Sequence, residues 1–163
     1  MSDDSRPAPG VQEVRALYQV DVLPLNVLAD SGPLIALFNA ADDWHVRVVQ
    51  WLKDHPETRL ITTWPVLTEV CALLARRIHN RAALDFLVWV ERSGLSLDTA
   101  GLASLSEVRR ISQRFASLPF DLADASIAEA AARLGLNAIL SIDADFDVYR
   151  DNQGRPLRNL LRS

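Results

Sequence analysis

Acidic residues stand at four places in the sequence where the neighbouring residues are apolar. They are Asp30, Glu69, Asp124 and Asp143. A carboxylate held in low-dielectric surroundings is costly unless positive charge compensates it, and several converging carboxylates repel one another. A hard divalent cation such as Mg²⁺ or Mn²⁺ relieves both effects. The pattern therefore predicts a metal site built from acids that are far apart in the chain.

Ordinary structural roles compete with this interpretation. Asp30 could cap a following helix, and Glu69 could face solvent. Asp143 could cap a loop, with Asp145 or Asp147 doing the chemistry instead. The joint placement of two acids after apolar runs and two on neighbouring helices favours the functional interpretation.

The third acid has a close rival three residues before it. Asp121 and Asp124 both fall at the start of an expected helix, where the helix dipole favours negative charge. Asp121 could therefore share or replace the role of Asp124, and the sequence leaves this open.

Short apolar segments alternate with amphipathic ones along the chain. Runs of apolar or β-branched residues, typical of strands covered on both faces, occur at residues 25–29, 59–63, 95–97 and 138–142, and a further strand is expected at 157–161. Helices are predicted between them, including one capped by Asp42 or Asp43, one opened by Pro65 and one beginning at Pro119. The alanine-rich stretch 123–134 has strong helix propensity, and Gly135 ends it.

Alternating strands and helices predict one α/β domain, a three-layer α/β/α sandwich with a central parallel sheet. In such sheets ligands bind at the carboxyl ends of the strands, where Asp30 and Asp143 fall. Residues 1–21 are expected to be an N-terminal extension, partly flexible, with a short helix at 11–18, and residues 22–163 to form the domain.

The composition limits how this protein could bind nucleic acid and where it could reside. The net charge of -4 argues against binding nucleic acid through bulk charge, so any such binding must be local. Lys53 is the only lysine, and nearly all positive charge is arginine, which pairs with phosphate through a planar fork. The lone Cys71 is expected to be buried in a reducing compartment, and Trp44, Trp51 and Trp64 are expected in the core. With no signal peptide or membrane span apparent, we expect a cytoplasmic protein.

Four short segments together resemble the PIN-domain ribonucleases, especially the VapC-type toxins of toxin–antitoxin systems. They are LADS at residues 28–31, TEV at 68–70, DLADASIA at 121–128 and SIDADF at 141–146. The resemblance runs from about Val22 to the C-terminus. Each segment is weak alone, but their order and spacing are fairly specific.

The resemblance implies site residues and a reaction. It gives catalytic roles to Asp30, Glu69, Asp124 and Asp143, with the three aspartates as ligands to Mg²⁺ or Mn²⁺. Ser31 and Ser141 match hydroxyl positions that flank the site, and Asp121 and Asp145 stay open as further ligands. The implied activity is metal-dependent hydrolysis of RNA phosphodiesters that leaves a 5′-phosphate and a 3′-hydroxyl. The implied partners are the RNA substrate, a VapB-like antitoxin and a second copy in a homodimer.

Two alternatives accompany this reading. Arg76, Arg77 and Arg150 could contact RNA phosphates, but exposed arginines are often only solvated surface. A non-catalytic RNA-binding or scaffold protein of the same fold would share the architecture, since fold alone does not fix function. The four acids disfavour that second alternative.

Overall fold

The computed structural model describes residues 25–151 and 153–162. Its centre is a five-stranded sheet with the strand order β3-β2-β1-β4-β5, and every pairing is parallel. The strands are β1 (Asn26–Ala29), β2 (Arg59–Thr63), β3 (Ser96–Asp98), β4 (Ala138–Leu140) and β5 (Arg158–Asn159). The predicted parallel α/β fold is confirmed. The predicted extension and helix in residues 1–21 lie outside the described residues.

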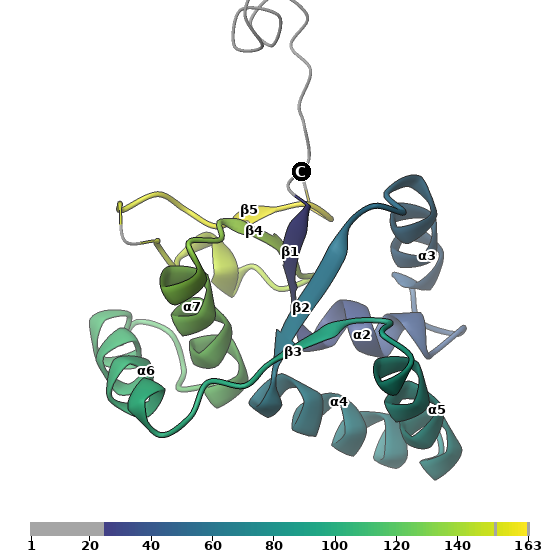
Figure 1. Cartoon of the computed structure of the whole chain (residues 1–163). Helices are drawn as coiled ribbons and strands as arrows, with labels where there is room; N and C mark the ends of the chain where they lie inside the picture. The colour runs from purple at the N-terminus through teal and green to yellow at the C-terminus, as the bar shows by residue number, and fades with distance from the viewer. Residues whose placement is uncertain (1–24, 152, 163) are drawn as a thin grey trace, which may run out of the picture.

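Helices flank the sheet on both sides. They are α2 (Ser31–Leu37), α3 (His45–Asp54), α4 (Trp64–Arg77), α5 (Asn80–Glu91), α6 (Ala103–Arg114) and α7 (Leu122–Leu134), with a short 3₁₀ helix η1 (Asp145–Asp147). Figure 1 shows α6 and α7 on one side of the strands and α2, α3 and α5 on the other. Helix α4 contacts α2, α5 and α7, so it connects the two groups. None of the described helices is long and apolar enough to span a bilayer.

Strand β1 lies at the centre of the sheet, between β2 and β4. Val27, Leu28 and Ala29 are all 0% exposed, which explains the unbroken apolar run there. The chain leaves β1 for β2 on one side and returns much later as β4 on the other. The strand order therefore reverses beside β1, and the carboxyl end of β1 is the switch point where ligands bind in such sheets.

Helix α7 packs closely on the rest of the domain because most of its side chains are small. Its alanines at positions 123, 125, 128, 130 and 131 are buried, together with Ser126. The hydroxyls of Thr63 and Ser126 form a 2.6 Å hydrogen bond that joins the end of β2 to α7. This contact fixes the first turns of α7, which carry Asp124, against the carboxyl edge of the sheet.

Strands β1, β3 and β5 differ from the predicted ranges by one or two residues, and three further boundaries were wrong. Helix α7 begins at Leu122 and not at Pro119, because the Asp121 carboxylate accepts hydrogen bonds from the backbone N–H groups of Ala123 and Asp124 and so sets the start. Strand β4 ends at Leu140, two residues earlier than predicted.

The third error concerns the start of α3. Its N-cap is Trp44, not Asp42 or Asp43, and the Asp42 carboxylate accepts instead from the Trp44 N–H in the preceding turn. Two burial predictions also need correction. Trp64 is 54% exposed and not in the core, and Cys71 is only half-buried.

Candidate active site

Asp30 lies at the carboxyl end of β1 and is the N-cap of α2. One carboxylate oxygen accepts from the Ser31 N–H at 2.6 Å, and the other accepts from the Ser141 hydroxyl at 2.8 Å. The residue is 3% exposed, and burial is the main cause that raises its pKa to about 6. Capping and a role in the site are therefore compatible, because the cap uses only one of the two oxygens.

Ser141 connects three acids. Its buried hydroxyl donates to Asp30 and accepts from the Asp143 N–H at 3.0 Å. The Asp143 carboxylate in turn accepts from the Asp145 N–H at 2.9 Å. This chain of hydrogen bonds holds the loop after β4 against the end of β1. Ser141 thus contacts the first acid through its hydroxyl, and Ser31 contacts it through its backbone N–H.

Asp121 and Asp124 have different surroundings. Asp121 caps α7 through the two backbone N–H groups described above, whereas Asp124 lies in the first turn of the helix, partly buried. Burial, followed by the negative charges of Asp30, Asp121, Asp143 and Asp145, raises the pKa of Asp124 to about 8. Asp121 therefore caps α7 with one carboxylate oxygen, whereas Asp124 takes no part in the cap, and whether Asp121 also binds an ion stays open.

Glu69 completes the cluster from α4. Its side chain is half-buried, and its charge is one of the causes that raise the pKa of Asp30. Asp143, which is exposed, raises the pKa of both Asp30 and Asp124. Asp30, Glu69, Asp124 and Asp143 therefore converge on one region, although 113 positions separate Asp30 from Asp143 in the chain.

No cation compensates these acids among the described residues. None of the salt bridges there involves Asp30, Glu69, Asp124 or Asp143, and no arginine or lysine is among the causes that shift the pKa of Asp30 or Asp124. The nearest acids raise one another's pKa instead. The cluster is therefore an uncompensated concentration of negative charge and of hard oxygen donors.

This donor set fits a hard divalent cation that keeps part of its water shell. In the described part of the chain, no group of three His, Cys, Asp or Glu side chains is arranged to hold an ion directly. Mg²⁺ commonly binds proteins through one or two carboxylates and several waters. The convergence and the missing counter-charge agree with such an ion, and water would complete its coordination.

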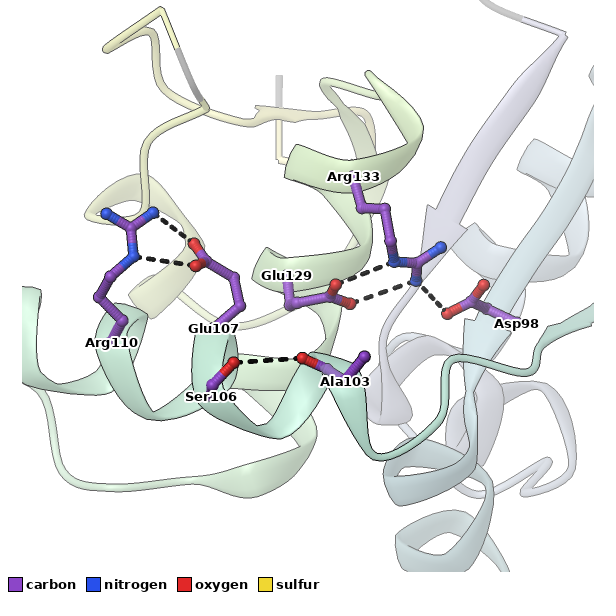
Figure 2. Close-up of polar contacts among 7 residues, drawn as sticks. All are labelled: Asp98, Ala103, Ser106, Glu107, Arg110, Glu129 and Arg133. Carbon is purple, nitrogen blue, oxygen red and sulfur yellow. Dashed lines mark hydrogen bonds and ion pairs between the residues drawn. The ribbon is translucent and has the colours of Figure 1, made fainter.

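Arg133, in the last turn of α7, forms ion pairs away from the cluster. Figure 2 shows Arg133 of α7 reaching both Glu129 of the same helix and Asp98 at the end of β3, with N–O distances of 2.9 and 2.6 Å. Glu129 is 4% exposed, so this network supplies a partner to a carboxylate that would otherwise be buried alone. It also fixes α7, and with it Asp124, to the edge of the sheet.

The predicted phosphate-binding arginines do not lie among the acids. The Arg150 guanidinium donates to the backbone carbonyls of Asp147, Val148 and Tyr149, and the side chain borders a separate small hollow on α6. Arg76 and Arg77 are exposed in the last turn of α4, about 10 Å along the helix axis from Glu69. Their role toward RNA stays a prediction.

Sequence reasoning missed three aromatic residues around the site. Tyr149 is 3% exposed, and burial together with Asp124, Asp121 and Asp145 raises its pKa to about 12, which places it beside the acids. Trp64 and Phe120 are exposed on either side of the cluster. Nothing in the local sequence distinguishes these rings from core aromatics, because their exposure depends on which elements pack around them.

Comparison with protein families gives a match to the PIN domain over residues 27–152, which include all four acids. The chain belongs to the PIN-domain family. A solved PIN-domain structure, that of VapC20 from Mycobacterium tuberculosis, described as a toxin that cleaves the sarcin–ricin loop, superposes with a TM-score of 0.71 at 21% sequence identity. The match covers 80% of this chain and 99% of VapC20. Among curated protein sequences there is no match.

Proposed function

We propose that this PIN-domain protein is a metal-dependent endoribonuclease of the VapC type. The family assignment and the likeness to VapC20 support a VapC-type nuclease. One observation carries the proposal for this chain: Asp30 and Asp124, with pKa values raised to about 6 and about 8, converge with Glu69 and Asp143 and have no positive partner among the described residues. Converging carboxylates without a positive partner destabilise a fold, so their position at a ligand-binding edge indicates that a cation binds there.

Asp30, Asp124 and Asp143 are the residues that would hold the ion, with Glu69 beside them. PIN-domain nucleases generally use divalent metal ions, and Mg²⁺ and Mn²⁺ both suit carboxylate and water ligands. When bound, the ion supplies Lewis-acid stabilisation of the charge that develops on the phosphoryl group and makes a water molecule more acidic.

The remaining residues orient the acids. The Ser141 hydroxyl keeps one Asp30 oxygen in place and, through the Asp143 N–H, ties the loop after β4 to it. Asp121 keeps the first turn of α7 in register by capping it. Asp124 holds a proton at neutral pH in the absence of an ion, because its pKa is about 8, and must release it when a cation binds.

The proposal extends to substrate and partners. We infer that the substrate is single-stranded or looped RNA, whose backbone can enter a cleft at the sheet edge. Since VapC20 is described as cleaving the sarcin–ricin loop, an rRNA hairpin carrying that loop belongs among the test substrates. A VapB-like antitoxin, a homodimer and a cytoplasmic location complete the proposal.

Cleavage of a mixed RNA pool tests the activity. The purified protein should cleave RNA with Mg²⁺ or Mn²⁺ and lose activity in EDTA, and Asp30→Asn should be inactive. Asp85→Asn, which alters an exposed carboxylate paired with Arg81 on α5, is the matched control and should stay active. Calorimetric titration with Mn²⁺ gives a second readout, in which wild type binds and Asp30→Asn binds weakly. Full activity of Asp30→Asn, or undiminished cleavage in EDTA, would refute the proposal.

A further inference from the structure

The described part of the chain has two exposed aromatic side chains, and both lie beside the acid cluster. Trp64 is 54% exposed and Phe120 is 72% exposed, while the other tryptophans and phenylalanines described are buried or half-buried. Trp64 begins α4 directly after β2, and Phe120 immediately precedes the α7 cap Asp121. Both rings therefore stand where the chain enters a helix that carries a site acid.

Trp64 borders a hollow that is also lined by Glu69 of the cluster and by the α7 cap Asp121. This hollow, which we name the Trp64 hollow, has a volume of about 510 Å³ and is lined by Trp64, Thr68, Glu69, Asp121 and Leu122, among others. Its surface is mostly apolar except for the two carboxylates. A flat apolar group could lie against the indole with its polar end directed at the acids.

Phe120 borders a second hollow on the other side of Asp121. This Phe120 hollow, of about 540 Å³, is lined by Arg109, Phe120, Asp121, Leu122 and Tyr149, among others. Asp121 and Leu122 border both hollows, so the two adjoin across the start of α7. Arg109 is exposed and forms no ion pair with any described residue, which leaves a guanidinium beside an apolar wall.

We propose that the two hollows are nucleobase subsites, in which unpaired bases on either side of the cleaved phosphodiester stack on Trp64 and on Phe120. This inference rests on the proposed ribonuclease function and specifies its substrate. Every base has a π-face, and stacking on aromatic side chains is the usual way in which proteins hold single-stranded nucleic acid. With the scissile phosphate at the acids, its two neighbouring nucleotides fall on opposite sides of Asp121.

Charge favours RNA over an apolar peptide as the occupant. Arg109 offers a bidentate contact to a backbone phosphate at the Phe120 hollow. The two hollows adjoin at Asp121, whose charge acts on Asp124, and Glu69 of the Trp64 hollow acts in the same way on Asp30, so an occupant of both hollows lies next to the acid cluster. An RNA strand can place its phosphate beside the acids and its bases in the two hollows.

The inference predicts that the enzyme requires unpaired nucleotides around the cut. An RNA oligonucleotide with one cleavage site, mapped with the wild-type protein, is made in three forms: intact, and with an abasic residue on either side of the cut. On intact RNA, Trp64→Ala and Phe120→Ala should each raise KM about tenfold. On RNA that is abasic at the position facing the substituted ring, the same change should alter KM by less than about twofold, because the stacking partner is already missing.

Matched variants separate stacking from general apolar packing. Phe120→Tyr keeps a ring and should behave as wild type, whereas Phe120→Leu keeps apolar character without a ring and should behave as Phe120→Ala. Leu84→Ala, which alters an apolar residue 59% exposed on α5 and outside both hollows, is the control and should leave KM unchanged. Sedimentation of each variant at the assay concentration reports whether its oligomeric state has changed.

The outcomes distinguish this inference from the function on which it rests. A wild-type protein that cleaves no RNA overturns the proposed function and the subsites with it. If the wild type cleaves RNA but Trp64→Ala and Phe120→Ala change KM equally on intact and abasic RNA, the proposed subsites alone are overturned. A Phe120→Leu variant with normal KM also overturns them, and so does a Phe120→Ala variant whose defect follows dissociation of a dimer, because the Phe120 hollow then holds protein.

Discussion

Asp30 combines deep burial with a raised pKa, so its charge opposes folding of the metal-free protein. Its pKa is about 6 in the folded protein, against the ordinary aspartate value of 3.8 that we take for the unfolded chain. The folded protein therefore binds this proton more tightly than the unfolded chain does, and stability falls as the pH rises from about 4 to about 6. The penalty is absent below that window and complete above it. One pKa unit is worth about 1.4 kcal/mol, so a difference of about two units gives about 3 kcal/mol.

Asp30→Asn removes this charge and should stabilise the metal-free protein at pH 8. The amide can still accept from the Ser31 N–H, but its NH₂ group must donate to the Ser141 hydroxyl, which now donates to Asp30. Reversing that hydrogen bond costs about 1 kcal/mol. We therefore expect a net gain of about 2 kcal/mol, equivalent to a rise in Tm of roughly 4 to 8 °C for a domain of this size.

Urea unfolding in EDTA at pH 4 and pH 8 measures this effect. The gain should be present at pH 8 and absent at pH 4, where the Asp30 carboxyl is protonated in the folded protein and already about 40% protonated in the unfolded chain, so that little of the penalty remains. Asp85→Asn, which changes an exposed carboxylate, should show little difference at either pH. A variant less stable than wild type at pH 8, or equally altered at both pH values, would show that the Asp30 charge is not held at a cost.

Three further changes test other parts of the site. Because the Asp124 proton must leave when a cation binds and its pKa is about 8, Mn²⁺ affinity should rise with pH by up to about tenfold per unit until pH 8; equal affinity at pH 6.5 and 8.5 in calorimetry would contradict this. Gly32→Ala would place a Cβ 2.5 Å from Ile142 Cγ1, so we expect a loss of about 1 to 3 kcal/mol and reduced cleavage, measured by unfolding and initial rates. Arg133→Met removes the partner of buried Glu129, and because Arg133 is 37% exposed we expect a loss of about 2 kcal/mol; unchanged urea unfolding would count against the ion-pair network.

Strand ends were the part of the site that the sequence predicted best. Asp30 directly follows Val27, Leu28 and Ala29, which are fully buried, so its position at the carboxyl edge follows from the pattern. Asp143 was harder to place, because the apolar run continues past the strand. Ile142 is apolar because it packs over Gly32, not because it belongs to the sheet. A hydrophobic pattern records burial and does not distinguish these two reasons for it.

The roles of the acids on helices could not be predicted from hydrophobic periodicity alone. The sequence could not show which of Asp121 and Asp124 belongs to the site, since an aspartate at either position suits the start of a helix. The structure shows that Asp121 caps the start of α7 with one oxygen and that Asp124 does not, which gives the two acids different surroundings without excluding either from the site. Glu69 gave only a weak local signal, an acid inside an otherwise apolar helix, which an exposed surface residue would also explain. Exposure of Trp64 and Phe120 likewise depends on tertiary packing, which a single sequence does not report.

The cap of α2 and the candidate metal site share one residue, and this sharing explains the arrangement of the cluster. Asp30 must be ionised to serve as a strong ligand, yet its burial favours the protonated form. The Ser31 N–H and the Ser141 hydroxyl lower its pKa, and so keep the value near 6 and not higher. At pH 7 the Asp30 carboxylate is therefore already charged, while Asp124 stays protonated until a cation arrives. The two acids would then act in order, with Asp30 as the fixed ligand and Asp124 as the one that responds to the ion.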